Sequence, residues 1–184
     1  MAGQAVADVE RQLVVFELAN ERYGVDIDTV REIIRMQDIT HVPNSPDYVD
    51  GVTNLRGKVI PVVNLRKLFG LEPGEVTSET RIVVVEIDGE DIGVCVDAVA
   101  EVLRVAESSV EQENSAVVTT MDSTYMQGIA SLDHDLIILL DLAKALSGDD
   151  IAAQKIDEPE LREVKKPSAQ ETKPAAKKLK EAAA

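Results

Sequence analysis

LVVFELANERYGVDIDTVREII, residues 13–34, is followed 69 residues later by IVVVEIDGEDIGVCVDAVAEVL, residues 82–103. The two segments align without a gap, and nine of their 22 positions are identical, among them Gly24 and Gly93. Because both are rich in β-branched residues, they predict one β-rich unit that is used twice. Two tandem copies imply two similar subdomains, and the seam between the subdomains is a natural place for binding.

A second pair of related segments follows the first pair. Residues 49–69 match residues 126–146 at an offset of 77, so the second copy carries eight extra residues between its halves. Each of these segments is expected to form a hairpin, with bends at residues 56–58 and 133–135. Pro61 cannot donate to a ladder, so we expect it at a sheet edge or a bulge.

The two copies differ in how strongly their sequences predict a turn in the first hairpin. Asp88-Gly89 is a strong hairpin signal. In the first copy we expect the turn at Asn20-Glu21. Short strands with closely spaced turns favour small closed or nearly closed barrels over one large parallel sheet, since the chain lacks the long amphipathic helices of βαβ units.

Helical pattern is confined to short stretches. Residues 65–71 and 141–147 predict short helices, with Asp141 as the N-cap of the second. Residues 28–36 fit either a helical turn or a strand, and we favour a helix-like turn that leads into a strand.

Composition restricts the class of protein. The chain of 184 residues is 45% hydrophobic but only 3% aromatic, with no Trp, so its core must be built from Val, Ile and Leu. No apolar run approaches the length of a membrane span, the N-terminus lacks a signal-peptide pattern, and the single cysteine predicts a reducing cytoplasm. The net charge of −15 disfavours nucleic-acid binding.

Charge and composition also suggest boundaries. We expect a flexible N-terminus over residues 1–11 and a folded domain over residues 12–148. A C-terminal tail over residues 149–184 would follow, with a helical pattern up to residue 164 and disorder beyond it. The tail carries eight acidic and eight basic residues, so the whole net charge lies on the preceding part of the chain.

Residues that could carry chemistry are few. His41 and His134 have no His or Cys neighbour at metal-ligand spacing, and no nucleophile-elbow or phosphate-binding motif occurs. Cys95 lies in an apolar strand, where a buried small hydrophobe is the favoured interpretation. Acidic pairs at residues 26/28 and 133/135 share strand faces, as acid–base catalysis requires, but 34 acidic residues produce such pairs by chance. A binding module is therefore favoured, with an acidic-residue enzyme in a barrel mouth as a weaker alternative.

The second hairpins differ in charge between the copies. Arg56 is replaced by Asp133, and Lys58 by Asp135, at matching positions. Either both bends are merely solvated, or the two subdomains carry complementary patches that join head to tail with a relative of the same fold. Arg56 has another possible role, since its guanidinium can fork onto a carboxylate such as Glu32 and stiffen the bend.

Several of these strings resemble the CheW family of chemotaxis coupling proteins. The resemblance rests on YGVDI at residues 23–27, GVTNLRGKVIPVVNLR at residues 51–66 and IGVCVD at residues 92–97. It extends over about residues 12–147, nearly all of the expected folded region.

The resemblance implies an all-β fold with short helices, made of two intertwined SH3-like five-stranded β-barrels around an apolar groove. It implies a cytoplasmic adaptor without enzymatic activity, cofactor or metal, recruited to membrane-bound receptor arrays without inserting into the membrane. Its implied partners are the signalling tips of methyl-accepting chemoreceptors and the regulatory domain of the histidine kinase CheA, which shares the fold and alternates with the adaptor in rings. An adaptor of a different chemosensory array is the alternative within this class.

Site residues are carried over by position. The family's receptor- and kinase-coupling loop falls on Asn54, Arg56 and Gly57, and a partner-contact segment falls on Val30 and Glu32. The apolar seam is implied to be lined by Ile27, Val94, Val99 and Val102, for which ordinary core packing is an equal alternative. The charge reversal adds two contact candidates in the second subdomain, Asp133 and Asp135.

Overall fold

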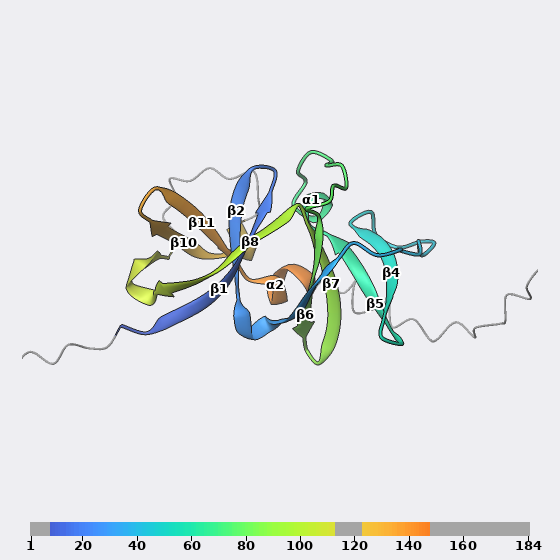
Figure 1. Ribbon diagram of the computed structural model, residues 1–184, viewed down its shortest axis with the longest axis horizontal. Coiled ribbons are helices and arrows are strands. Elements are labelled where there is room, and N and C mark those ends of the chain that lie inside the picture. Colours follow the sequence, from blue (N-terminus) through green and yellow to red (C-terminus); the bar gives the residue numbers. More distant parts are fainter. Residues whose placement is uncertain (1–7, 113–122, 148–184) are drawn as a thin grey trace, which may run out of the picture. The chain divides into compact units, whose positions relative to one another are not determined.

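The computed structural model describes residues 8–112 and 123–147 (Figure 1). In chain order the strands are β1 (Glu10–Leu18), β2 (Glu21–Asp26), β3 (Val30–Arg35), β4 (Val49–Leu55), β5 (Lys58–Asn64), β6 (Arg81–Ile87), β7 (Glu90–Val96), β8 (Ala98–Ala106), β9 (Val110–Glu111), β10 (Met126–Leu132) and β11 (Asp135–Leu140). The short helices are α1 (Leu65–Leu68) and α2 (Leu142–Leu146), with 3-10 turns η1 (Ile27–Thr29), η2 (Glu107–Ser109) and η3 (Ser123–Tyr125).

Both sheets belong to one unit of the chain, Met1–Ala153. β1 already begins at Glu10, inside the stretch expected as a flexible N-terminus. The tail expected over residues 149–184 lies outside the described residues, and so does the second unit, Gln154–Ala184.

The strands form two sheets that each close on themselves. The first barrel has the order β8-β1-β2-β11-β10-β9, and the second barrel has the order β3-β6-β7-β5-β4. β8 and β9 are parts of one segment that pairs with β1 at one end of the sheet and with β10 at the other, which closes the first barrel. In the second barrel, Thr40, which follows β3 in the chain, forms an isolated bridge to Val52 of β4. The predicted fold of two small SH3-like β-barrels is confirmed.

Neither barrel is built from one copy of the repeat. The first barrel combines β1 and β2 of the first copy with β8, β10 and β11 of the second, and the second barrel makes the opposite combination. Apart from β9, which has no counterpart strand, the two strand orders become identical when each strand is replaced by its repeat counterpart. The repeat therefore predicts two barrels of one design, and the structure adds that the copies exchange their first hairpins.

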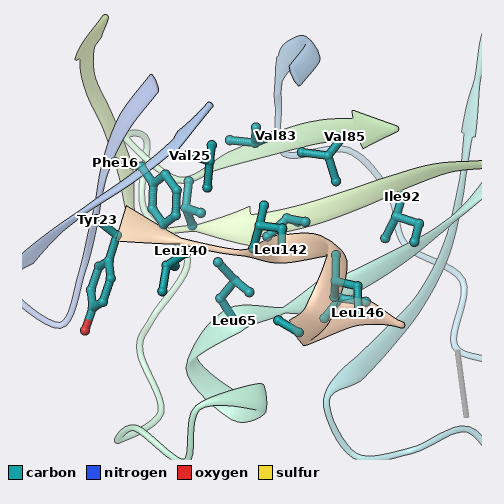
Figure 2. Packing of buried hydrophobic residues seen from close by; sticks show 14 of the residues in the cluster. Phe16, Tyr23, Val25, Leu65, Val83, Val85, Ile92, Leu140, Leu142 and Leu146 are labelled. Atoms are coloured by element: carbon teal, nitrogen blue, oxygen red, sulfur yellow. The ribbon is translucent and has the colours of Figure 1, made fainter. Parts of the chain in front are cut away.

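The exchanged hairpins are buried on both faces. On β1, Leu13 and Val15 face the interior of the first barrel, whereas Val14 and Phe16 face a shared core between the barrels. Figure 2 shows Phe16 in this shared core together with Val83 and Val85 of β6. The same alternation recurs on β6, where Ile82 and Val84 point inward and Val83 and Val85 point into the shared core. This explains why the strands read as nearly continuous apolar runs instead of alternating with polar residues.

Four of the five aromatic residues of the chain form a row at one end of the shared core. Ring centroids lie 6.1 Å apart for Phe16 and Tyr23, 6.5 Å for Tyr23 and Phe69, and 6.2 Å for Phe69 and Tyr125. Because Phe69 follows α1 and Tyr23 lies on β2, this row joins the second barrel to the first. Burial, together with a hydrogen bond from the hydroxyl to Glu21, raises the pKa of Tyr23.

Local predictions meet mixed outcomes. The turn and strand expected over residues 28–36 are confirmed as η1 and β3, and Asp141 caps α2 by accepting the Lys144 N–H at 3.0 Å. The first hairpin turn is at Ala19 and Asn20, one residue earlier than expected, and both have positive φ angles of 50° and 68°. The turn between β4 and β5 has two residues instead of the three expected, with Arg56 in its first position.

Pro61 was expected at a sheet edge or a bulge. It lies in an interior strand and not at an edge, and the irregularity of the β4–β5 pairing is close by, between Val49 and Gly51. β5 runs between β4 and β7. Val52, opposite Pro61, exchanges its backbone hydrogen bonds with Thr40, and parallel pairing with β7 begins at Val62. The missing N–H of Pro61 therefore interrupts neither ladder.

An ion pair joins the two barrels. The Arg66 guanidinium on α1 pairs through two nitrogens with Asp97, between β7 and β8, with Nε donating to Oδ1 at 2.7 Å. Asp97 Oδ2 also accepts the backbone N–H of Ala19 at 2.9 Å, which fixes the strained β1–β2 turn. We call this set of contacts the Asp97 clamp.

Gly51→Ala is predicted to open the second barrel at its closure. A Cβ at Gly51 would lie 2.1 Å from the Thr40 carbonyl oxygen, and φ there is +144°. We expect a loss of about 2–4 kcal/mol in the free energy of unfolding in urea. Gly70→Ala is the control. Its φ is also positive, at +66°, but a Cβ at Gly70 would meet no other atom within 4 Å. This variant should therefore lose only about 1–2 kcal/mol. Equal losses would contradict the close approach.

The Asp97 clamp predicts an acid-sensitive stability. Burial alone would raise the pKa of Asp97, but hydrogen bonds from Arg66 and Ala19 and the Arg66 charge hold this pKa below its ordinary value. The carboxylate therefore stabilises the fold above the unfolded-state pKa of about 4, and this contribution is lost as the pH falls through the lower folded-state pKa. Asp97→Asn should be less stable than the parent in urea at pH 7, and the deficit should shrink below about pH 4. A deficit independent of pH would refute this assignment.

Candidate functional site

Arg56 occupies a backbone conformation that its side chain does not favour. Arg56 and Gly57 form the β4–β5 turn with φ angles of 52° and 87°, as two-residue hairpin turns require. The Asn54 side-chain oxygen accepts the Gly57 N–H at 2.8 Å and fixes this turn. In the counterpart turn Asp133 has φ of 47°, which an aspartate tolerates better than an arginine. Arg56 is thus held in a costly conformation at an exposed site, where backbone strain often accompanies function.

The guanidinium of Arg56 forks onto Glu32. Nη1 lies 3.2 Å from Oε1 and Nη2 lies 2.9 Å from Oε2. The Arg56 side chain is 77% exposed and that of Glu32 is 25% exposed, so a partner can reach the cation without displacing core residues. The structure therefore brings Asn54, Arg56, Gly57 and Glu32 together.

A second ion pair beside this turn is reversed in polarity in the other barrel. Lys58 Nζ lies 2.9 Å from Asp91 Oδ2 in the second barrel. At the counterpart positions of the first barrel, Asp135 Oδ2 lies 2.8 Å from Arg22 Nη1. The replacement of Lys58 by Asp135 is therefore compensated within each barrel by the replacement of Asp91 by Arg22.

The two barrel tips consequently differ in charge less simply than the sequence suggests. The second tip, made of Glu32, Arg56, Lys58 and Asp91, balances two cations against two carboxylates. At the first tip, Arg22 lies near Glu101 and Asp135, and Asp133 adds a third carboxylate on the same turn. Of the two alternatives for these bends, the one with a positive and a negative patch is therefore modified to one charge-balanced tip and one acidic tip.

Two β-bulges create an apolar strip beside the shared core. A register shift between Val30 and Glu32 on β3 recurs at the counterpart positions of β8, next to Val99. Each bulge places residues three apart on one face. Val30 pairs with Val85 and Val99 pairs with Phe16, both in the shared core, so Val30 and Val99 pack against that core.

The other predicted seam residues lie at different depths. Val94 is 1% exposed and belongs to the floor of the shared core, whereas Ile27 is partly buried against it. Val102 is 52% exposed and lies opposite Val14, so it forms the rim of the strip. Its counterpart Ile33 is 40% exposed and was missed, although the 69-residue offset aligns the two. Below we call Val30, Ile33, Val99 and Val102 the seam strip.

Groups with other chemistry lie apart from these surfaces. Cys95 is buried in the interior of the second barrel, as expected, and burial raises the pKa of its thiol to about 11. His41 is exposed in a loop and His134 in a turn. Over residues 8–112 and 123–147, no three His, Cys, Asp or Glu residues are grouped to hold a metal ion. In the same ranges no helix is long and apolar enough to cross a membrane.

Comparisons with known proteins agree on one family. The family model described as CheW-like domain matches residues 12–150. The chain is 34% identical to chemotaxis protein CheW of Treponema pallidum over 151 residues, which cover 80% of this chain and 88% of that protein. It is 35% identical to chemotaxis protein CheW of Thermotoga maritima over 137 residues, or 74% and 88% of the two chains. The crystal structure of the scaffolding protein TtCheW from Thermoanaerobacter tengcongensis is similar, with a TM-score of 0.71 and 39% identity over 77% of this chain and 96% of that one.

Arg56→Ala is predicted to leave the fold nearly as stable as before. The pair with Glu32 is exposed, so its loss should change the free energy of unfolding by less than about 1 kcal/mol. Arg66→Ala is the contrast. The side chains of Arg66 and Asp97 are only 20% and 31% exposed, so this variant should lose about 1.5–3 kcal/mol in the free energy of unfolding. Chemical denaturation measures both, and equal losses would make Arg56 a structural residue.

Proposed function

Because the chain belongs to the CheW-like domain family and is a chemotaxis adaptor, we propose that it couples chemoreceptors to the histidine kinase CheA without catalysing a reaction. It would bind the cytoplasmic signalling tips of methyl-accepting receptors and the regulatory domain of the kinase, and so be recruited to receptor arrays from the cytoplasm. Holding both partners at once raises their effective local concentration.

The observation that carries this proposal is the unequal pair of barrel tips. One scaffold, used twice, presents the Arg56–Glu32 fork on one tip. On the other tip Arg22 lies near Glu101 and Asp135, and Asp133 adds a carboxylate in the adjoining turn. In a complex with a partner of the same fold, the acidic tip of one molecule would contact the tip of the other molecule that corresponds to the Arg56 tip. Such a contact is heterologous and can close into a ring. The regulatory domain of CheA is the partner that we assign to the tips. Exposed rim charges of this kind govern orientation and association rate more than they govern affinity.

We assign the receptor to the seam strip. Receptor tips are helical hairpins, and a helix presents its apolar residues at intervals of three and four. The strip offers half-exposed aliphatic residues from both barrels, with Ile33 on β3 and Val102 on β8. A helix lying there would contact both barrels at once.

A binding titration against each partner separates the two surfaces. Arg56→Glu and Asp133→Arg should each weaken binding of the kinase regulatory domain by at least about tenfold in Kd, or about 1.4 kcal/mol, by replacing attraction with repulsion. Both should bind a receptor tip fragment with the parent Kd. Isothermal titration calorimetry with purified full-length chain measures all four values.

Two control variants make the same kind of charge reversal at residues other than those named for the two tips. Lys67→Glu also reverses an exposed cation that pairs with a carboxylate, Asp50. Asp88→Arg also reverses an aspartate at a positive-φ turn position. Both controls should bind the kinase domain as the parent does. If neither partner binds the parent chain, the assignment to this array fails. Binding to the receptors of another chemosensory array would then support an adaptor of that array. Substrate turnover that depends on one carboxylate would support an acidic-residue enzyme.

A further inference from the structure

The described chain passes between the two barrels at two places. Residues 26–30 lead from β2 of the first barrel to β3 of the second, and residues 96–98 lead back from β7 to β8. The 69-residue offset makes these crossings counterparts of each other. Any change in the angle between the barrels must be absorbed at these two points, because hinges act through a few residues at the ends of elements.

The crossing at residues 96–98 is fixed by the Asp97 clamp. Its carboxylate is held from the second barrel by Arg66 and from the first barrel by the Ala19 N–H, and the Asp97 N–H donates to the Glu17 carbonyl at 3.1 Å. Arg66 is itself immobilised, because Nη1 donates to the Glu72 carbonyl at 2.8 Å.

Two further contacts reinforce the same crossing. The chain passes so close over the guanidinium of Arg66 that a Cβ at Gly74 would lie 2.5 Å from Cζ. The stacked contact of Tyr23 on Phe69 also joins the β1–β2 hairpin to α1. This end of the shared core is therefore held by an ion pair, backbone hydrogen bonds and aromatic packing together.

The counterpart crossing has an ion pair of its own, but this pair does not span the barrels. Arg11 contacts both carboxylate oxygens of Asp26, and both residues belong to strands of the first barrel. Asp28 stands at the position of Asp97, but Ala143 stands at the position of Arg66 and has no side chain to reach it. The crossing is a 3-10 turn with Asp28 exposed, and Thr29 Oγ1 donates to the Asp26 carbonyl at 2.7 Å within the turn itself. Among the described residues, no side-chain hydrogen bond or ion pair joins this turn to α2.

The packing near the second crossing is aliphatic as well. The counterparts of Tyr23 and Phe69 are Ile92 and Leu146, both buried in the shared core. Aliphatic contacts are less directional than hydrogen bonds or stacked rings, so they tolerate small rotations with less loss. The pseudo-symmetric scaffold therefore has one end at which side-chain polar contacts span the two barrels and one end at which aliphatic packing joins them.

We propose that the two barrels form a one-sided hinge, in which the crossing at Asp97 is the pivot, the crossing at Asp28 yields, and Arg66 limits the range of the angle. The seam strip takes residues from β3 of one barrel and β8 of the other, so its width follows this angle. The hinge is a property of the free chain, and its test does not depend on the proposed partners.

The distance between two spin labels, one on each barrel, tests the hinge. Arg35 on β3 and Arg104 on β8 are exposed counterparts at the 69-residue offset, and each is replaced by cysteine in a Cys95→Ala background of the full chain. Pulsed electron–electron double resonance then measures the distance distribution. Arg66→Ala should widen this distribution by at least about twofold relative to the parent, because the pivot is released.

Lys67→Ala is the matched control. Lys67 is also a cation of α1 that pairs with an aspartate, but its partner Asp50 lies on β4 of the same barrel. Its removal should leave the distribution unchanged. An unchanged width in Arg66→Ala, or equal widening in Lys67→Ala, overturns the proposal. If Arg66→Ala does not fold, Arg66→Lys takes its place, because it keeps the charge but loses the two-pronged contact. A wider distance distribution in Arg66→Lys supports the hinge, and an unchanged width overturns it.

Discussion

Every feature of this protein depends on the burial of both faces of the β1–β2 and β6–β7 hairpins. One face fills the interior of a barrel and the other fills the shared core, so residues such as Phe16 and Val83 are as fully buried as those inside the barrels. Burial of side chains of this size contributes roughly 1.5–3 kcal/mol each. A barrel separated from its partner would expose this face to water. The two barrels are therefore parts of one folding unit, and the surfaces that they present are positioned relative to each other by the same core.

The two halves of this scaffold differ at a few positions, and we attribute the function to these differences. The Lys58–Asp91 pair and its reversed counterpart, Asp135–Arg22, keep each barrel tip internally paired. What remains different is Arg56 against Asp133, and this difference distinguishes the tips for a partner. The shared core differs between its ends as well, since Arg66 has Ala143 as its counterpart. A duplicated fold can thus carry two unlike contacts and one restrained crossing without any change in its strand order.

Part of this structure follows from sequence because it is local. The 69-residue repeat, the Asp88-Gly89 turn and the cap at Asp141 depend on neighbours in the chain, and they predict the hairpins and the short helices correctly. The fork of Arg56 onto Glu32 was also foreseeable, because a guanidinium at a bend seeks a nearby carboxylate. The exchange of hairpins was not foreseeable from the repeat itself, since two copies of one hairpin fit either barrel equally well. Only the family resemblance implied intertwined barrels. The compensating charges Asp91 and Arg22 were not foreseeable either. Asp91 pairs with Lys58 and Arg22 pairs with Asp135, on strands that are distant in sequence and become neighbours only through that exchange.

The central claim is that neither barrel is stable without the other, and the segment of residues 27–97 tests it most directly. This segment contains all five strands of the second barrel in one continuous stretch. If the shared core is the deciding constraint, the isolated segment should give a poorly dispersed NMR spectrum and no cooperative unfolding transition in urea, whereas the full chain gives one transition. A well-dispersed spectrum and a cooperative transition for the segment alone would contradict the account.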